Sequence, residues 1–361
     1  MQLVKGKLVA AVVVSSLYGC GHEGPSTPSP TPSPGSGPGP SAPPPAVGGT
    51  LSGRVVNAVT GAPVEAASIA VEGMPPTTAD SDGSFRIELS TSGNVRLTVE
   101  APGYWTRQTG VRPVSGSPPE VTLGLLPDGN DFDLEFYDHV FRDVGADGTH
   151  AWTSEPQFEI WEGVYECTGF VESAGCEELT AKEERAPDTF LHMMRNVIAI
   201  DARKYTDGHV LGSNVSARSH APGTVLPLSQ YFERGKVTVA FVERPDYFSW
   251  AFWRFNNGGS MTSGHVQLNR DHRALRGVYS HELAHMLGFD HPLGLDQVPL
   301  SSIMRRGHGD DPTRIDILHA RILYGRPPNS RTPDIDPASF VVNGLRQAET
   351  ETGPEITRSA R

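Results

Sequence analysis

Hydrophobic and polar residues alternate in short runs between residues 50 and 126. The runs are rich in β-branched residues, and Gly, Pro, Asn and Asp, which are typical of turns, separate them. Short strands that recur at this spacing predict a small all-β sandwich. The runs are LSGRVVNAVTGAPV, ASIAVEG, SDGSFRIEL, NVRLTVEAPGY and EVTLGLL.

The pattern changes after about residue 127, where aromatic residues, histidines and helical periodicity increase. Residues 188–205 begin with Asp188, a good N-cap, and favour a helix although their middle is β-branched. Residues 236–243 and 264–269 favour strands, and the stretch after them favours a helix. We therefore expect a second domain over residues 127–329.

The two ends of the chain have a different character. Residues 330–361 are polar and aperiodic, which predicts a C-terminal tail that contains a short ordered fragment at most. Near the other end, Lys5 and Lys7 precede the apolar run 8–14, which is too short to span a bilayer and is typical of a secretory signal peptide.

The residues Leu17-Tyr18-Gly19-Cys20 resemble the lipobox of bacterial lipoproteins. That resemblance implies a signal peptide at 1–19 and a lipidated Cys20 at the start of the mature chain. Because Gly21 stands where an inner-membrane retention signal has Asp, it also implies anchoring at the outer membrane or cell surface of a bacterial envelope. An ordinary cleaved signal, and so a secreted protein, is the alternative.

Residues 20–49 are almost entirely Pro, Ser, Gly, Thr and Ala. Such a segment cannot build a core and favours extended conformations, so at about 3.1 Å per residue it would reach on the order of 70 Å. It predicts a linker between the anchor and the first domain.

The net charge and the cysteine count indicate which partners and which cysteine chemistry to expect. The signal peptide contains two lysines and no acidic residue, so its removal changes the formal net charge from −12 to −14. A chain this acidic is a poor candidate for nucleic-acid binding. Of its three cysteines, Cys167 and Cys176 remain as a pair if Cys20 carries lipid, and we expect a disulfide in an oxidising compartment. Two free buried thiols are the alternative for a cytoplasmic chain.

Several motifs in residues 50–126 resemble the carboxypeptidase regulatory-like domain. The resemblance implies a transthyretin-like sandwich that acts as a spacer or docking module, since no catalytic constellation occurs there. The motifs are Gly53-Arg54-Val55-Val56, Thr60-Gly61-Ala62-Pro63-Val64, Asp82-Gly83-Ser84-Phe85 and Ala101-Pro102-Gly103-Tyr104.

Three histidines lie within HELAHMLGFDH, residues 281–291. On a helix over residues 273–287, His281 and His285 project from one face, about 6 Å apart along the axis. His291 would lie about 120° away from that face if the helix continued. Gly288 can adopt the left-handed conformation that ends a helix and turns the chain back. The three imidazoles can then bind one Zn²⁺ and leave its fourth position open, as in catalytic sites.

Glu282 follows the first of these histidines, so its carboxylate can accept a proton from a zinc-activated water and deliver it to a leaving amine. These parts suit the hydrolysis of peptide bonds.

The spacing His281-Glu282-x-x-His285-x-x-Gly288-x-x-His291 resembles the signature of the metzincin zinc metalloproteases. Ser302-Ile303-Met304 resembles their methionine turn, which implies that Met304 supports the ligand histidines without binding the metal. The resemblance implies an α+β domain with a mixed twisted sheet and an active-site helix. It also implies an edge strand for protein or peptide substrates, which we expect at residues 255–264. Arg306 departs from relatives that have a tyrosine there, and neither a cysteine switch nor calcium-binding repeats occur.

The histidines allow alternative assignments. No glutamate occurs between Glu282 and Glu349, which argues strongly against a glutamate ligand on a later helix. An aspartate in place of His291 is the remaining zinc alternative, and a non-catalytic or very selective zinc-containing surface binding protein is the alternative function, although such a protein needs no Glu282. The candidate aspartates are Asp296, Asp310, Asp311 and Asp316, and the nearby histidines without ligand spacing, expected at the surface or in the core, are His265, His272, His308 and His319.

Overall fold

The computed structural model describes most of the chain after residue 47, and residues from Ala46 onward form one compact unit. Within this described part, no helix is both long and apolar enough to cross a membrane. Four expected features lie outside it: the signal peptide expected at 1–19, the lipidation site expected at Cys20, the linker expected at 20–49 up to residue 47, and the helix expected at 188–205. The described residues are 48–91, 93–113, 120–129, 132–142, 148–168, 175–180, 215–221, 223–243, 249–269, 276–291, 302–305, 312–342 and 356–360.

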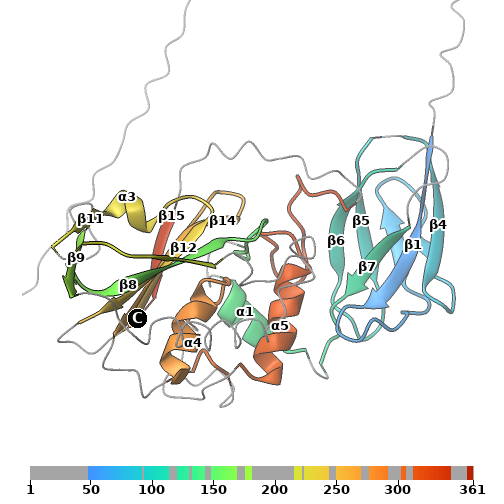
Figure 1. The fold of residues 1–361 in the computed structure, drawn as a ribbon. Coiled ribbons are helices and arrows are strands. Elements are labelled where there is room, and N and C mark those ends of the chain that lie inside the picture. Colours follow the sequence, from blue (N-terminus) through green and yellow to red (C-terminus); the bar gives the residue numbers. More distant parts are fainter. Residues whose placement is uncertain are drawn as a thin grey trace, which may run out of the picture. The chain divides into compact units, whose positions relative to one another are not determined.

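The first domain is a sandwich of two small sheets (Figure 1). One sheet has the order β4-β1-β7 and the other the order β3-β2-β5-β6. Pairing is antiparallel except between β1 and β7, which run parallel. The strands are β1 (Gly49–Asn57), β2 (Ser68–Val71), β3 (Thr77–Thr78), β4 (Ser84–Leu89), β5 (Val95–Glu100), β6 (Arg107–Val111) and β7 (Val121–Leu125).

Alternation of side chains explains this core. In β1, Leu51 and Val55 are fully buried while Arg54 is exposed, as expected for a strand with one face against a second sheet. Ile69 of β2 and Leu97 of β5 enter the same core from the other sheet. The all-β sandwich predicted from the hydrophobic pattern is therefore confirmed.

The second domain is built on a mixed sheet with the strand order β11-β9-β8-β12-β14-β13-β15, and β10 pairs with β8. β12 runs parallel to both β8 and β14, whereas β13 is antiparallel to β14. The strands predicted at 236–243 and 264–269 are present as β12 and β14. The strands are β8 (Gln157–Thr168), β9 (Gly175–Thr180), β10 (Val215–Arg218), β11 (Val225–Pro227), β12 (Lys236–Val242), β13 (Trp250–Phe255), β14 (Met261–Asn269) and β15 (Ile356–Ala360).

Helices cover one face of this sheet (Figure 1). Apolar side chains of α1, α4 and α5 share a core with β12, β13 and β14. Almost all residues of these three strands are buried, on the face toward the helices and on the opposite face. A short helix, α3, follows β11. The helices are α1 (Leu134–Phe141), α3 (Leu228–Tyr231), α4 (Arg276–His285) and α5 (Arg314–Tyr324).

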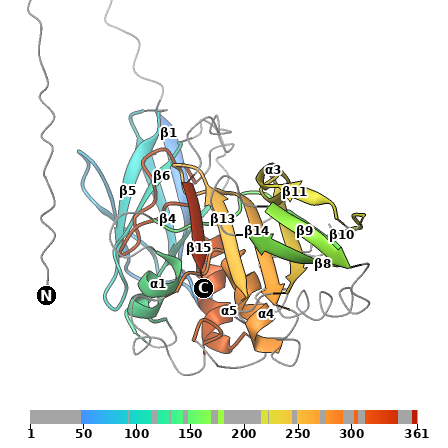
Figure 2. The ribbon, with the colours of Figure 1, turned by 90° about the vertical axis from the view of Figure 1, so that its left-hand side faces the viewer.

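The region beyond residue 329 differs from the tail that we expected. Residues 330–342 lie against the sandwich, where Asp334 and Asp336 are buried and the backbone of Gln108 exchanges hydrogen bonds with both. Ile356–Ala360 form β15, which pairs with β13 (Figure 2). We expected a tail because the residues are polar. Polar groups can nevertheless be buried when a distant part of the chain provides their hydrogen-bond partners, as it does here.

Candidate metal centre

Helix α4 places His281 and His285 one turn apart and ends at His285. The amide of Gly288 donates to the carbonyl of His285 at 3.1 Å, and Gly288 has φ +89°. This left-handed residue turns the chain out of the helix. A Cβ at this position would lie 2.1 Å from the carbonyl oxygen of His150, so the turn requires glycine for space as well as for conformation.

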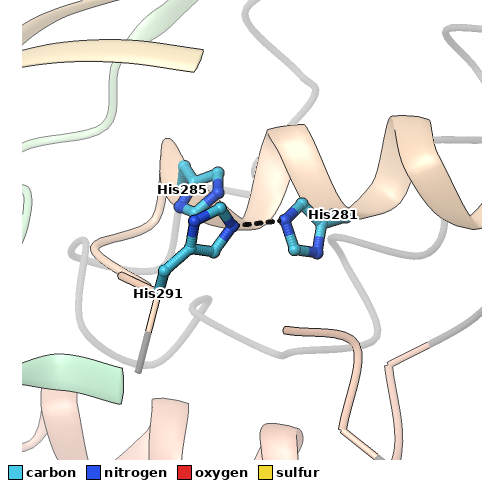
Figure 3. Close-up of side chains that lie close together, drawn as sticks. All are labelled: His281, His285 and His291. Carbon is cyan, nitrogen blue, oxygen red and sulfur yellow. Dashed lines mark hydrogen bonds between the residues drawn. The ribbon is translucent and has the colours of Figure 1, made fainter. Parts of the chain in front are cut away.

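The turn after α4 brings His291 back to the other two histidines (Figure 3). One ring nitrogen from each of His281, His285 and His291 lies within 4.8 Å of the others. The Nε2 atoms of His281 and His291 are 2.8 Å apart, and the ring of His285 is 4.6 Å from that of His291 between centroids. The structure thus assembles the three predicted ligands at one point.

Backbone carbonyls fix the orientation of two of these rings. Nδ1–H of His281 donates to the carbonyl oxygen of Ile303 at 2.7 Å, and Nδ1–H of His285 donates to that of Phe289 at 2.8 Å. In a neutral imidazole this leaves the lone pair on Nε2, the atom that faces the other histidines. Such carbonyl contacts are typical of histidines that bind a metal through Nε2.

Two buried polar atoms at this site have no hydrogen-bond partner among the described residues: Nε2 of His285 and Oε2 of Glu282. His285 is fully buried, and Glu282 is 3 % exposed. Burial lowers the pKa of His285 well below its usual value, and the neighbouring histidines lower it further. Burial also raises the pKa of Glu282 well above that of an ordinary carboxyl. Unpartnered groups of this kind are costly, so both atoms are available to a bound ion or molecule.

Met304 lies in a tight turn next to the histidines. The amide of Arg305 donates to the carbonyl of Ser302, which closes the turn, and Met304 is fully buried. Because Ile303 within this turn provides the acceptor for His281, the turn supports the site directly.

Asp316 has a role that the sequence did not indicate, since its position suggested only an alternative zinc ligand. The buried carboxylate accepts hydrogen bonds from the Ser302 hydroxyl at 2.6 Å and from the amide of Ile303 at 3.0 Å. It also caps α5, through the amide and hydroxyl of Thr313. Asp316 therefore joins the start of α5 to the methionine turn. The spacing Thr313-x-x-Asp316 is a capping-box pattern that could have revealed half of this role.

Aromatic residues that the sequence did not single out hold the helix end in place. The ring of Trp253, in β13, stacks on that of His285 with centroids 5.4 Å apart. Nε1–H of Trp152 donates to the carbonyl of Met286 at 2.7 Å, and the hydroxyl of Tyr324 donates to that of Leu287 at 3.2 Å. These contacts restrict how far the turn can move.

The other histidines are distributed as follows. His265 is buried in β14, shares a hydrogen bond of 2.6 Å with Thr238, and has its pKa lowered by burial to about 3. His319 is buried in α5 and stacks on Phe132. Both belong to the core. His272, His308, Asp296, Asp310, Asp311 and Arg306 lie outside the described residues.

The strand register of β8 and β9 brings the two remaining cysteines opposite each other. Cys167 is the partner of Cys176 in this antiparallel pair. Directly paired residues on antiparallel strands have Cα atoms about 4.5–5.5 Å apart, which lies within the range that a disulfide requires. The backbone register is therefore compatible with the predicted bond.

We expect Gly288→Ala to lower the free energy of unfolding by about 2–3 kcal/mol, because the methyl group meets the His150 carbonyl and the backbone is strained. Gly223→Ala is a matched control, since φ is +79° there but no atom lies within 4 Å of the added Cβ. It should cost about 1 kcal/mol. Urea denaturation of both variants measures the difference, and equal losses would show that the contact with His150 is unimportant.

Comparison with known protein families identifies the first domain. Residues 50–126 match the carboxypeptidase regulatory-like domain family, which supports the resemblance stated from the sequence. No curated protein matches the chain.

Proposed function

We propose that the chain is a zinc-dependent metalloendopeptidase of the metzincin type that hydrolyses peptide bonds in protein or peptide substrates. The observation that carries the proposal is the convergence of His281, His285 and His291 beside a buried Glu282 whose Oε2 has no partner among the described residues. The mixed sheet, the helix α4 and the turn at Met304 support the same class.

The donor set fits a zinc ion. Three neutral imidazoles are ligands that zinc prefers, and three protein ligands are the usual number in catalytic zinc sites. The orphaned Nε2 of His285 is the atom expected to bind the metal. When bound, zinc would act as a Lewis acid that lowers the pKa of a water molecule to about 7 and polarises the substrate carbonyl.

Glu282 is the residue of this chain that moves the proton. Its carboxylate takes a proton from the attacking water and transfers it to the amine of the leaving group. Burial keeps competing water away from this carboxylate and raises its proton affinity, while a nearby cation favours the ionised form that acts as base. A site that only holds zinc has no need for this buried acid.

Asp316 is not available as the replacement ligand of the aspartate alternative, since Ser302, Ile303 and Thr313 donate hydrogen bonds to it. His291 lies at the cluster instead. Among the described residues, this favours the three-histidine site over the aspartate alternative.

We further propose that Cys20 carries the lipid that anchors the protein to a bacterial envelope, and that Cys167 and Cys176 form a disulfide there. The support for the anchor is the lipobox-like sequence, and the support for the disulfide is the strand register.

Removal and return of the metal test the function. We expect residues 46–361 to bind one zinc ion per chain, to cleave a denatured protein only with zinc, and to lose both properties in His281→Ala. His139→Ala, on α1 and outside the cluster, should keep them. Metal analysis and gel assays give the readouts.

Zinc binding without cleavage of denatured protein or a peptide library would support the surface binding protein instead. A chain that binds no zinc would show that the ligand assignment is wrong.

A further inference from the structure

Strand β15 lies at an edge of the sheet that borders the metal centre. It pairs with β13 in antiparallel register. Ile356 is opposite Phe255, Arg358 is opposite Trp253, and Ala360 is opposite Ala251. Among the described strands, β13 lies between β14 and β15. Without β15, β13 would be the edge strand of this sheet. Figure 2 shows the two strands side by side.

β13 is in direct contact with the candidate site. The ring of Trp253 stacks on His285, and Trp253 is also the ladder partner of Arg358. The backbone of β15 therefore runs beside the residue that touches a predicted metal ligand. The strand expected at residues 255–264 is placed differently, because residues 256–259 form the turn between β13 and β14.

An uncovered strand edge presents a row of unpaired N–H and C=O groups that accepts an extended peptide as a further strand. β15 meets this description, because five consecutive residues without proline pair with β13. It comes from a part of the chain about a hundred residues away from β13, so no hairpin turn imposes the pairing.

We propose that residues 356–360 occupy the outer edge of β13 as a pseudosubstrate strand, which an extended peptide must displace before it can pair with that edge. This inference rests on the proposed peptidase function only for its effect on hydrolysis. A segment on the same chain has an effective concentration on the order of millimolar, which is enough for a weakly binding strand to occupy the edge.

The variant Thr357→Pro/Arg358→Pro tests the proposal. Alternate residues of an antiparallel strand donate to a given neighbour, so two consecutive prolines remove at least one N–H from the ladder with β13. Thr357→Ala/Arg358→Ala is the matched control, because it changes the same side chains and keeps both N–H groups. Both variants are made in residues 46–361, with and without Glu282→Gln.

The binding readout does not depend on hydrolysis. In the Glu282→Gln background, a fluorescein-labelled, amidated peptide with the sequence of residues 352–361 is titrated into each variant. We expect about tenfold tighter binding to the proline variant than to the alanine control, because its edge is free. Hydrogen exchange of residues 250–255 should be faster in the proline variant and should slow again when the peptide is added.

With Glu282 intact, the proline variant should cleave an extended peptide with kcat/KM raised about tenfold through a lower KM. Equal peptide binding by the two variants would overturn the inference, and so would unchanged hydrolysis in a chain that cleaves. If the proline variant binds the peptide more tightly but no variant hydrolyses peptides, the peptide-binding edge is retained and the peptidase function is rejected.

Discussion

Glu282→Gln is expected to reduce the rate of peptide hydrolysis by about a thousandfold, the usual contribution of a well-placed general acid–base. Glutamine has nearly the same shape as glutamate but cannot take up the proton. Because Glu282 is buried and its Oε2 has no partner among the described residues, the neutral side chain should leave the thermal midpoint of the metal-free chain unchanged or higher. Lost activity with retained stability is the signature that separates a catalytic carboxylate from a structural one.

A matched substitution gives the opposite signature. Glu159 in β8 is also buried, but it accepts a hydrogen bond from Nε1–H of Trp161 at 3.2 Å and lies 3.6 Å from Nζ of Lys236. Glu159→Gln should therefore lower the thermal midpoint and leave the rate per folded molecule unchanged. Initial rates at equal zinc occupancy and calorimetry provide both readouts. If Glu282→Gln retains more than a tenth of the rate, the proton passes through another group.

The sequence predicted the convergence of the three histidines because the features involved are local. The spacing of His281 and His285 follows from the helical period, and the return of His291 follows from the conformational freedom of Gly288. Alternation likewise predicted the sandwich, since a strand with one buried face shows its period in the sequence. These predictions needed only neighbouring residues.

Features that depend on distant pairing were missed. The carboxylate of Asp316 is polar and gives no sign in the sequence that it will bind Ser302 and Ile303 of another segment. β15 was assigned to a polar tail because its pairing partner, β13, is remote along the chain. Trp253 could be recognised as a core residue, but its stacking on His285 depends on how the sheet packs against α4.

The two domains also share a buried network of arginine and aspartate side chains that the sequence did not indicate. Arg107 of β6 and Arg326, just after α5, both donate to the carbonyl of Gly124, at 3.0 and 2.9 Å. Each is paired with a buried aspartate: Arg107 with Asp336 at 3.0 Å, and Arg326 with Asp334 through two bonds of 2.7 and 2.8 Å. Burial and the charge of Arg326 lower the pKa of Arg107, whereas the pKa of Arg326 is raised by Asp334 despite its burial.

The proposed catalytic domain therefore depends on the sandwich for the partners of these charges. A chain that began at residue 127 would lack Arg107 and Gly124, and Asp336 would lose its counterion. The family match covers residues 50–126, whereas residues from Ala46 onward form one compact unit, so the sandwich is a structural part of residues 46–361.

Arg107→Met is expected to lower the free energy of unfolding by about 3–5 kcal/mol, because the buried carboxylate of Asp336 loses its counterion. The variant Arg107→Met/Asp336→Leu should recover most of this loss, since a buried ion pair replaced by apolar residues of similar volume is often neutral in stability. Urea denaturation of the two single variants and the double variant gives the coupling between these residues. Arg96→Met is the control: among the described residues its guanidinium donates to the carbonyls of Asp336 and Pro337 and to no carboxylate, so it should cost about 1 kcal/mol.

Calorimetry of the same variants shows whether the ion pair couples the two domains. The wild-type chain should unfold in one transition, because the sandwich and the second domain share this buried network. Arg107→Met should separate the transition into two, with the second domain unfolding first, since the unpaired Asp336 belongs to it. A single transition with unchanged midpoint in Arg107→Met would mean that Asp336 gains hydration or another partner when Arg107 is removed, and that the network does not join the domains.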